Sequence, residues 1–210
     1  FDRNNILSKL KQYSLSGINQ KIIDLKVLFV EIDSTVYYDT AKVTNVNDLK
    51  SRVSASLSTF RTSNINKFGG RFKYSKICQI IDNVDDSITS NITKVIIRRN
   101  MKSLINQTAQ YELCFGNKFH INTKGFNIKS TGFTIAGNTT VCYFTDVPKT
   151  DTTGTISIVK DSAEDGNYEV VVKSAGTVDY TKGEIMINTI NITSTSQPNN
   201  IIEIQAVPES

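Results

Sequence analysis

Apolar residues recur at helical spacing in two segments of the first half of the chain. The first segment begins after Asn45, a candidate N-cap with Asp48 three residues further on, and places Leu49 and Val53 at the centre of its apolar stripe. The second segment covers residues 74–84. Both stripes predict amphipathic helices that bury one face against a sheet.

Three further segments surround these helices. Residues 6–13 have the spacing of a short helix, and residues 22–32 are apolar on both faces, which is typical of a central strand. Residues 92–99 alternate between apolar and polar positions and predict another strand. Helices and strands therefore interleave through about residue 105, which predicts a small α+β domain with helices packed on one sheet face.

Beyond residue 105 the period changes from helical to alternating. Short apolar runs are separated by turn sequences every ~8 to 12 residues, which is typical of sandwiches and barrels. Four hairpins and a last strand are predicted, with turns at 116–117, 137–138, 165–167 and 181–183 and the strand at 201–207. The fold class is thus predicted to be α+β, with a helix-on-sheet domain over residues 1–105 and an all-β, hairpin-rich domain over residues 106–210.

Composition and charge narrow the classes of partner. The chain has 210 residues, of which 39% are hydrophobic and 21% charged, so it has enough apolar residues to fold. Its net charge of +4 is too small and too scattered to predict nucleic-acid binding. No apolar run approaches the ~20 residues that span a bilayer. We therefore expect no nucleic-acid partner and no insertion into a membrane.

Residues with catalytic or metal-binding chemistry are sparse. His120 is the only histidine, and Cys78, Cys114 and Cys142 stand too far apart to form a CxxC pair. The alternating neighbours of His120 place it in a strand, where a structural role is far commoner than that of a general base. We therefore expect no enzymatic activity, no catalytic residue, no cofactor and no metal site.

Residues 66–99 carry a distinctive series of motifs. The run FGGRFKYSKI is followed by IDNVDDSI and then by a strand that ends in Arg98 and Arg99. This series resembles the carboxy-terminal portion of a baseplate wedge subunit of contractile-tailed bacteriophages, within the baseplate J-like family. The motif positions to which the resemblance assigns a structural role are Phe68, Gly69, Gly70, Tyr74, Asp82 and Asp85.

The resemblance implies a virion structural protein of the tail baseplate rather than an enzyme. It implies a subunit that forms a homodimer, contacts other baseplate wedge and hub proteins during viral tail assembly, and is assembled in the bacterial host cytoplasm. The β-rich half has more aromatic residues than one small core needs. We therefore expect its partner interface to include Phe119, Phe126, Phe133 and Tyr143.

A carbohydrate- or receptor-binding β-module of a phage tail is the alternative function. Hairpin-rich domains with exposed tyrosine, asparagine and threonine residues suit sugar recognition. Such a module needs a concave aromatic face, which the sequence alone does not reveal. A peptidoglycan-degrading hydrolase would need paired carboxylates or a Cys/His pair in a cleft, and no such pairing stands out.

Overall fold

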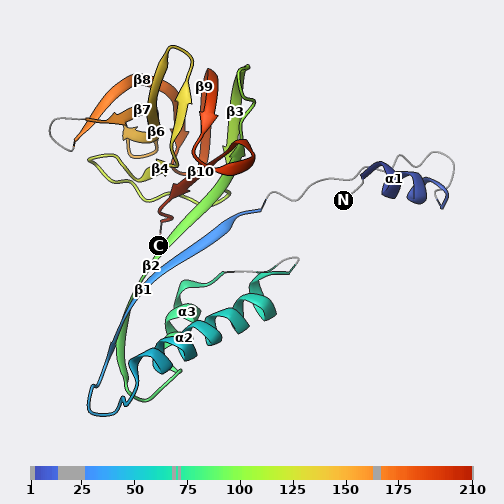
Figure 1. The fold of residues 1–210 in the computed structure, drawn as a ribbon. Helices are drawn as coiled ribbons and strands as arrows, with labels where there is room; N and C mark the ends of the chain where they lie inside the picture. Colours follow the sequence, from blue (N-terminus) through green and yellow to red (C-terminus); the bar gives the residue numbers. More distant parts are fainter. Residues whose placement is uncertain (1–2, 14–26, 68–69, 71, 163–166, 210) are drawn as a thin grey trace.

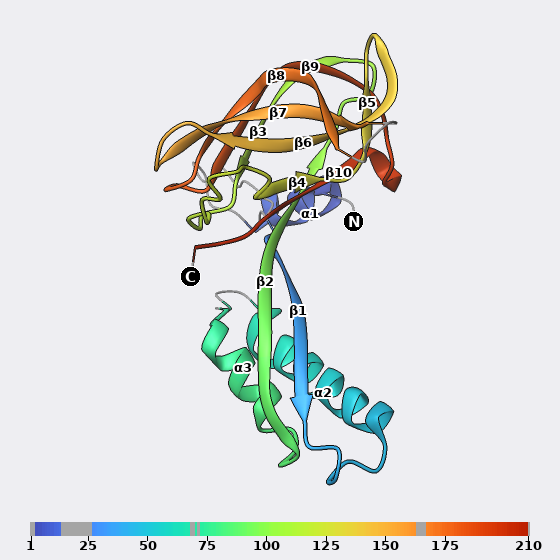
Figure 2. The ribbon, with the colours of Figure 1, turned by 90° about the vertical axis from the view of Figure 1, so that its left-hand side faces the viewer.

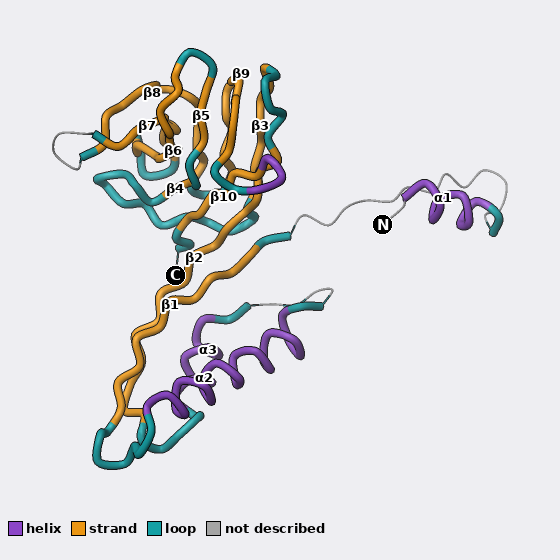
Figure 3. Tube along the Cα trace, viewed as in Figure 1, coloured by secondary structure: helices purple, strands orange, loops and turns teal. Residues whose placement is uncertain are grey.

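The computed structural model describes residues 3–13, 27–67, 70, 72–162 and 167–209. A β-barrel lies at one end, a long two-stranded ribbon leaves it, and two helices lie beside the ribbon (Figure 1). A further helix, α1 (Arg3–Lys11), lies near the N-terminus. Strands account for most of the regular structure, as the colouring of Figure 3 makes plain.

The ribbon and its helices form the first unit of the fold. Strands β1 (Phe29–Tyr38) and β2 (Ile88–Lys102) pair antiparallel. Between them in sequence lie α2 (Val46–Phe60), a short π-helical turn (Arg61–Ile65) and α3 (Tyr74–Asp82). Both helices lie on the same face of the ribbon (Figures 1 and 2). The opposite face carries no other element among the described residues.

The apolar stripes of α2 and α3 behave as their spacing predicts. Asn45 caps α2, because its side-chain oxygen accepts hydrogen bonds from the backbone N–H groups of Asn47 and Asp48. Leu49 is buried on the inner side of α2. Ile77 and Ile81, one turn apart on α3, are both buried as well. Both predicted helices are therefore confirmed.

The barrel is built from eight further strands. These are β3 (Thr108–Cys114), β4 (Ile128–Ser130), β5 (Phe133–Ile135), β6 (Asn138–Pro148), β7 (Thr153–Asp161), β8 (Tyr168–Asp179), β9 (Glu184–Thr195) and β10 (Ile201–Ala206). β6 pairs with both β5 and β7, so the order β6-β5-β9-β8-β7 closes into a ring. β3 adds to β9 outside this ring. A 3-10 turn (Pro198–Asn200) precedes β10.

Strand β2 joins the ribbon to the barrel. Its first part pairs with β1, from Ile88 opposite Tyr38 to Arg98 opposite Phe29. Its last part, residues 97–102, pairs with β10, which in turn pairs with β4. The ribbon and the barrel therefore share one continuous sheet.

The main core fills the barrel. Phe133 and Phe144 stack with ring centroids 4.3 Å apart. Tyr180 is buried beside them in the core, and its hydroxyl donates to the buried carboxylate of Asp146 at 2.7 Å. The other fully buried side chains of this core include Ile128, Ile156, Ile158, Ile185, Ile187, Ile192 and Ile202. β-branched isoleucine suits such strands because it packs well on a pleated surface.

The predicted α+β fold class is wrong. Strands make up 49% of the structure and helices 20%, with a closed β-barrel and few helices in place of a helix-on-sheet domain. The expected sheet under the helices consists of two strands only, because β2 continues into the barrel instead of turning back. The strand expected at 22–32 begins at Phe29 among the described residues, and residues 22–26 lie outside them. Its expected central place is wrong, because β1 is the terminal strand of the sheet.

Three of the four predicted hairpins are confirmed. β5 with β6, β7 with β8, and β8 with β9 pair as consecutive strands. Residues 165 and 166 of the turn expected at 165–167 lie outside the described residues. Gly183, in the last of these turns, has φ +67°, a conformation that L side chains rarely adopt. The hairpin expected at 116–117 is wrong, because β3 pairs with β9, while residues 118–121 contribute only an isolated bridge between Phe119 and Pro208.

Candidate functional site

The four aromatic residues expected at a partner interface do not share one environment. Phe119 and Phe133 are buried in the barrel core, so neither offers surface to a partner in this conformation. Phe126 is 41% exposed and stacks on Tyr168, with ring centroids 5.4 Å apart. Tyr143 is half-buried, and its hydroxyl lies 3.4 Å from Asp161 Oδ2. The interface role of Phe126 and Tyr143 stays a prediction.

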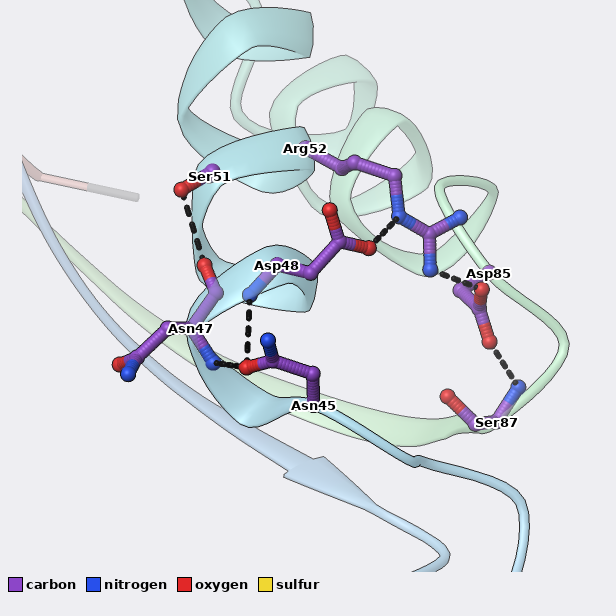
Figure 4. A network of polar contacts seen from close by, with 7 residues as sticks. All are labelled: Asn45, Asn47, Asp48, Ser51, Arg52, Asp85 and Ser87. Carbon is purple, nitrogen blue, oxygen red and sulfur yellow. Dashed lines mark hydrogen bonds and ion pairs between the residues drawn. The ribbon is translucent and has the colours of Figure 1, made fainter.

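Asp85 links the turn after α3 to the start of α2 (Figure 4). Its carboxylate accepts hydrogen bonds from the Ser87 backbone N–H at 2.9 Å and from the Arg52 guanidinium, which also pairs with Asp48 at 3.2 Å. Ser87, through its hydroxyl and its N–H, and Arg52 lower the pKa of Asp85 to about 2. Asp85 is therefore ionised at neutral pH and holds two segments together.

Asp82 and Tyr74 tie α3 to β2. Asp82 Oδ1 accepts a hydrogen bond of 2.6 Å from Asn91 Nδ2, and the same amide nitrogen lies 3.2 Å from the Cys78 carbonyl oxygen. At the other end of α3, the Tyr74 hydroxyl donates to the Thr93 carbonyl oxygen at 3.0 Å. These contacts give the motif positions a structural part in seating α3 on β2.

The glycine motif before α3 is described in part. Phe68 and Gly69 lie outside the described residues. The Gly70 N–H bonds to the Lys67 carbonyl at 3.0 Å. A Cβ atom at Gly70 would stand 2.2 Å from the Ile65 carbonyl oxygen, closer than real Cβ contacts. Close backbone approach therefore explains a glycine at this position.

Arg98 is the centre of the junction between ribbon and barrel. It pairs with Glu31 of β1 and with Glu203 of β10, and its guanidinium lies 4.6 Å from the centroid of the Phe29 ring. Gln205 of β10 donates a hydrogen bond of 2.7 Å to Glu31. The motif series points to Arg98, at the basic end of this strand. The acidic partners of Arg98 are 67 and 105 residues away in sequence, so the sequence alone does not reveal them.

Comparison with known families gives one match. Residues 26–100 match the family model of the baseplate structural protein gp6, C-terminal domain III. The match supports a structural protein of a phage baseplate. No curated protein sequence matches the chain.

The gp6-like segment coincides with the first unit of the fold. It includes β1, α2, α3 and the part of β2 that pairs with β1, and it ends at Asn100, within the stretch that pairs with β10. The Asp85, Asp82 and Arg98 contacts all have at least one partner inside it. The part of the chain that matches the family model is therefore the ribbon with its two helices rather than the barrel.

In the part of the chain that the structure describes, no set of three or more His, Cys, Asp or Glu side chains is placed to hold a metal ion. His120 is exposed, and burial raises the pKa of the Cys142 thiol. Among the same residues, no helix is both long and apolar enough to cross a membrane.

Proposed function

We propose that this chain is a structural component of a contractile-tail baseplate wedge that docks to other baseplate proteins and associates with itself. The match of residues 26–100 to the gp6 C-terminal domain III is the observation that carries this proposal. The fold supports it, because the gp6-like segment projects from the barrel as a separate arm (Figures 1 and 2). An arm and a barrel can contact different neighbours.

The face of the ribbon opposite the helices is suited to docking. In an antiparallel ribbon, alternate side chains share a face, and here that face includes Phe29, Tyr37 and Ile92. They are 38%, 48% and 56% exposed. Tyr37 and Ile92 lie towards the end of the ribbon away from the barrel, whereas Phe29 lies at the barrel end, with charged residues such as Asp33 and Lys94 between them. Exposed apolar side chains that share a face with charged ones suit contact with a partner. A two-stranded ribbon is marginal alone and gains from a partner that covers this face.

The barrel offers a second surface for self-association. Phe126 and Tyr168 stack and are 41% and 52% exposed, and Val170 on the same strand as Tyr168 is 48% exposed. A homodimer formed here would leave the arm free to contact wedge and hub proteins. The location that follows is the virion tail, after assembly in the host cytoplasm.

Sedimentation of the full chain with purified neighbouring baseplate proteins tests this function. Ile92→Asp should weaken docking by at least ~2 kcal/mol if Ile92 is a central anchor. Leu104→Asp is the matched control, because Leu104 is 50% exposed between β2 and β3 and is not among the residues of either proposed surface. If no baseplate neighbour binds and the chain instead binds host-surface glycans, the receptor-binding alternative replaces the assembly function.

A further inference from the structure

The outer edge of β1 has no neighbour among the described residues. β1 is the terminal strand of the sheet and pairs with β2 alone. β2, by contrast, pairs with β10 over residues 97–102, and its Thr93 carbonyl oxygen accepts a hydrogen bond from the Tyr74 hydroxyl. An open edge presents unpaired N–H and C=O groups to any extended chain that reaches it.

The hydrogen bonds around β2 indicate which groups of β1 point outwards. The Ser103 N–H bonds to the Asn200 carbonyl, next to β10, so Ser103 and every second residue of β2 before it, Thr93 included, direct their backbone groups away from β1. Thr93 lies opposite Ser34. Residues of an antiparallel pair alternate between bonded and non-bonded positions, so Ser34 and every second residue from it direct their N–H and C=O groups away from β2. The outward groups therefore belong to Val30, Ile32, Ser34 and Val36.

β1 lacks most of the features that keep natural edge strands from pairing, and before Tyr37 only the charges of Glu31 and Asp33 protect its edge. It is ten residues long, and its sequence FVEIDSTVYY contains neither proline nor lysine. Its register with β2 is regular up to Tyr37, so no bulge twists the edge away before that point. Natural proteins use short strands, lysine, proline or bulges to protect such edges. The long, regular edge is suited to accept another strand.

The charges of β1 indicate which kind of chain can pair with its open edge. Glu31 and Asp33 are its only charged residues, and β1 has no cation of its own. Glu31 is paired with Arg98, whereas Asp33 is exposed and, although it lies opposite Lys94, forms no ion pair within the described chain. A second copy of β1 would bring two more carboxylates to this surface and no cation, and like charges that face each other across strands are destabilising.

We propose that the edge of β1 accepts an extended segment of another baseplate protein as an added strand, with a lysine or arginine of that segment beside Asp33. Backbone hydrogen bonds to the outward groups of β1 supply the affinity, and the cation fixes the register. The added strand would form a three-stranded sheet with β1 and β2. This inference specifies how a partner binds the ribbon, and it rests on the proposed function.

Amide hydrogen exchange, resolved to single residues, tests this site in the full chain alone and in assembled tails. The outward amides of Ile32, Ser34 and Val36 should exchange at least ~10-fold more slowly in the tail than in the free chain. Unchanged exchange in a tail that contains the chain overturns the strand-addition site and leaves the proposed function standing. Absence of the chain from the tail overturns the proposed function itself.

Dilution of the free chain separates the two possible kinds of occupant. If protection of these amides appears in the free chain and rises with its concentration, a second copy occupies the edge, and the heterologous strand is wrong. With a foreign strand as the occupant, exchange in the free chain stays fast at every concentration.

Variants of Asp33 test whether the added strand places a lysine or arginine beside this residue. Asp33→Lys should reduce the protection in assembled tails, and Asp33→Asn, which adds no cation beside Lys94, should reduce it less. Asp151→Lys is the matched control, since Asp151 is exposed in a barrel turn. Barrel amides should keep their exchange rates in all three variants, which verifies folding. Equal protection in Asp33→Lys and Asp151→Lys tails would overturn the role of the cation.

Discussion

The buried carboxylate of Asp146 depends on a few hydrogen bonds inside the barrel. Its Oδ2 accepts from the Tyr180 hydroxyl at 2.7 Å, and its Oδ1 accepts from the Ile128 backbone N–H at 2.7 Å. Both Asp146 and Tyr180 are buried, and burial with the Asp146 interaction raises the pKa of Tyr180, so the phenol stays protonated as the donor. The pair joins β6 to the residue that follows β8, over the intervening strand β7, where the Tyr180 hydroxyl lies close to Gly154.

Tyr180→Phe should therefore destabilise the chain. It removes a donor from a buried carboxylate, which costs about 1 to 3 kcal/mol of unfolding free energy. Chemical denaturation measures this, with Tyr168→Phe as the control because Tyr168 is 52% exposed. Equal stability of the two variants would show that the Asp146 contact contributes nothing.

The lowered pKa of Asp85 makes the free energy of unfolding depend on pH. Its folded pKa of about 2 lies below the value of ~3.9 for an unfolded aspartate, so the folded state favours the ionised form. Its contribution is complete above about pH 4 and is lost as the pH falls through about 2. Asp85→Asn should remove this part of the pH dependence in denaturation measured between pH 5 and 2. An unchanged slope in that window would contradict the linkage.

Arg99 contrasts with its neighbour Arg98. Arg98 has two carboxylate partners, whereas Arg99 forms no ion pair in the described structure, and its Nε is buried without a hydrogen bond. Burial lowers the pKa of Arg99, because the charged form loses solvation. Arg99→Met should raise the unfolding free energy by about 1 kcal/mol, since it removes an unsatisfied donor. A loss of stability in denaturant would show that Arg99 has a favourable partner in solution.

At the scale of elements, α2 provides a direct test of packing. Leu49 is 4% exposed at the centre of the helix stripe. Leu49→Ala should cost roughly 2 to 5 kcal/mol of unfolding free energy. Val46→Ala is the control, because Val46 is 49% exposed on the same helix and should change stability by less than about 0.5 kcal/mol. A loss below that level for Leu49→Ala would place the stripe at a loosely packed surface.

Local sequence signals predicted local elements and failed for long-range ones. α2 and its Asn45 cap, α3 and three hairpins depend on residues close in sequence. The β3 to β9 pairing joins Thr108 to Asn191, and no turn signal announces it. Gly116 does have φ +70°, yet the chain after it leaves the sheet. Ring closure by β6 and β7 likewise follows from packing of the whole barrel.

The candidate sites show the same division. Local motifs point to Asp82 and Asp85, and their contacts in the structure reach β2 and α2 respectively, while the structural role that the resemblance assigns to them stays a prediction. The sequence could not separate buried Phe119 and Phe133 from exposed Phe126, because all three have similar alternating surroundings. The open edge of β1 could not be predicted from the sequence either, because it depends on the pairing of all the strands in the sheet.

For the whole molecule, we propose that residues 1–105 and 106–210 are separate domains. The closed ring of β5 to β9 lies entirely within residues 133–195, so its closure does not need β2. A fragment of residues 106–210 should thus give a dispersed NMR spectrum. A fragment of residues 88–210 should be more stable, because it keeps the pairing of β2 with β10. A collapsed spectrum for the shorter fragment alone would move the boundary to the start of β2.

Cross-linking mass spectrometry of intact phage tails tests the central claim most directly. Lys94 is exposed on the free face of the ribbon and can react with an amine-specific cross-linker. A baseplate structural protein that docks through this arm should yield cross-links from Lys94 to other baseplate proteins. Absence of the chain from purified tails, or its recovery there with no Lys94 cross-link to any other baseplate protein, would contradict the account.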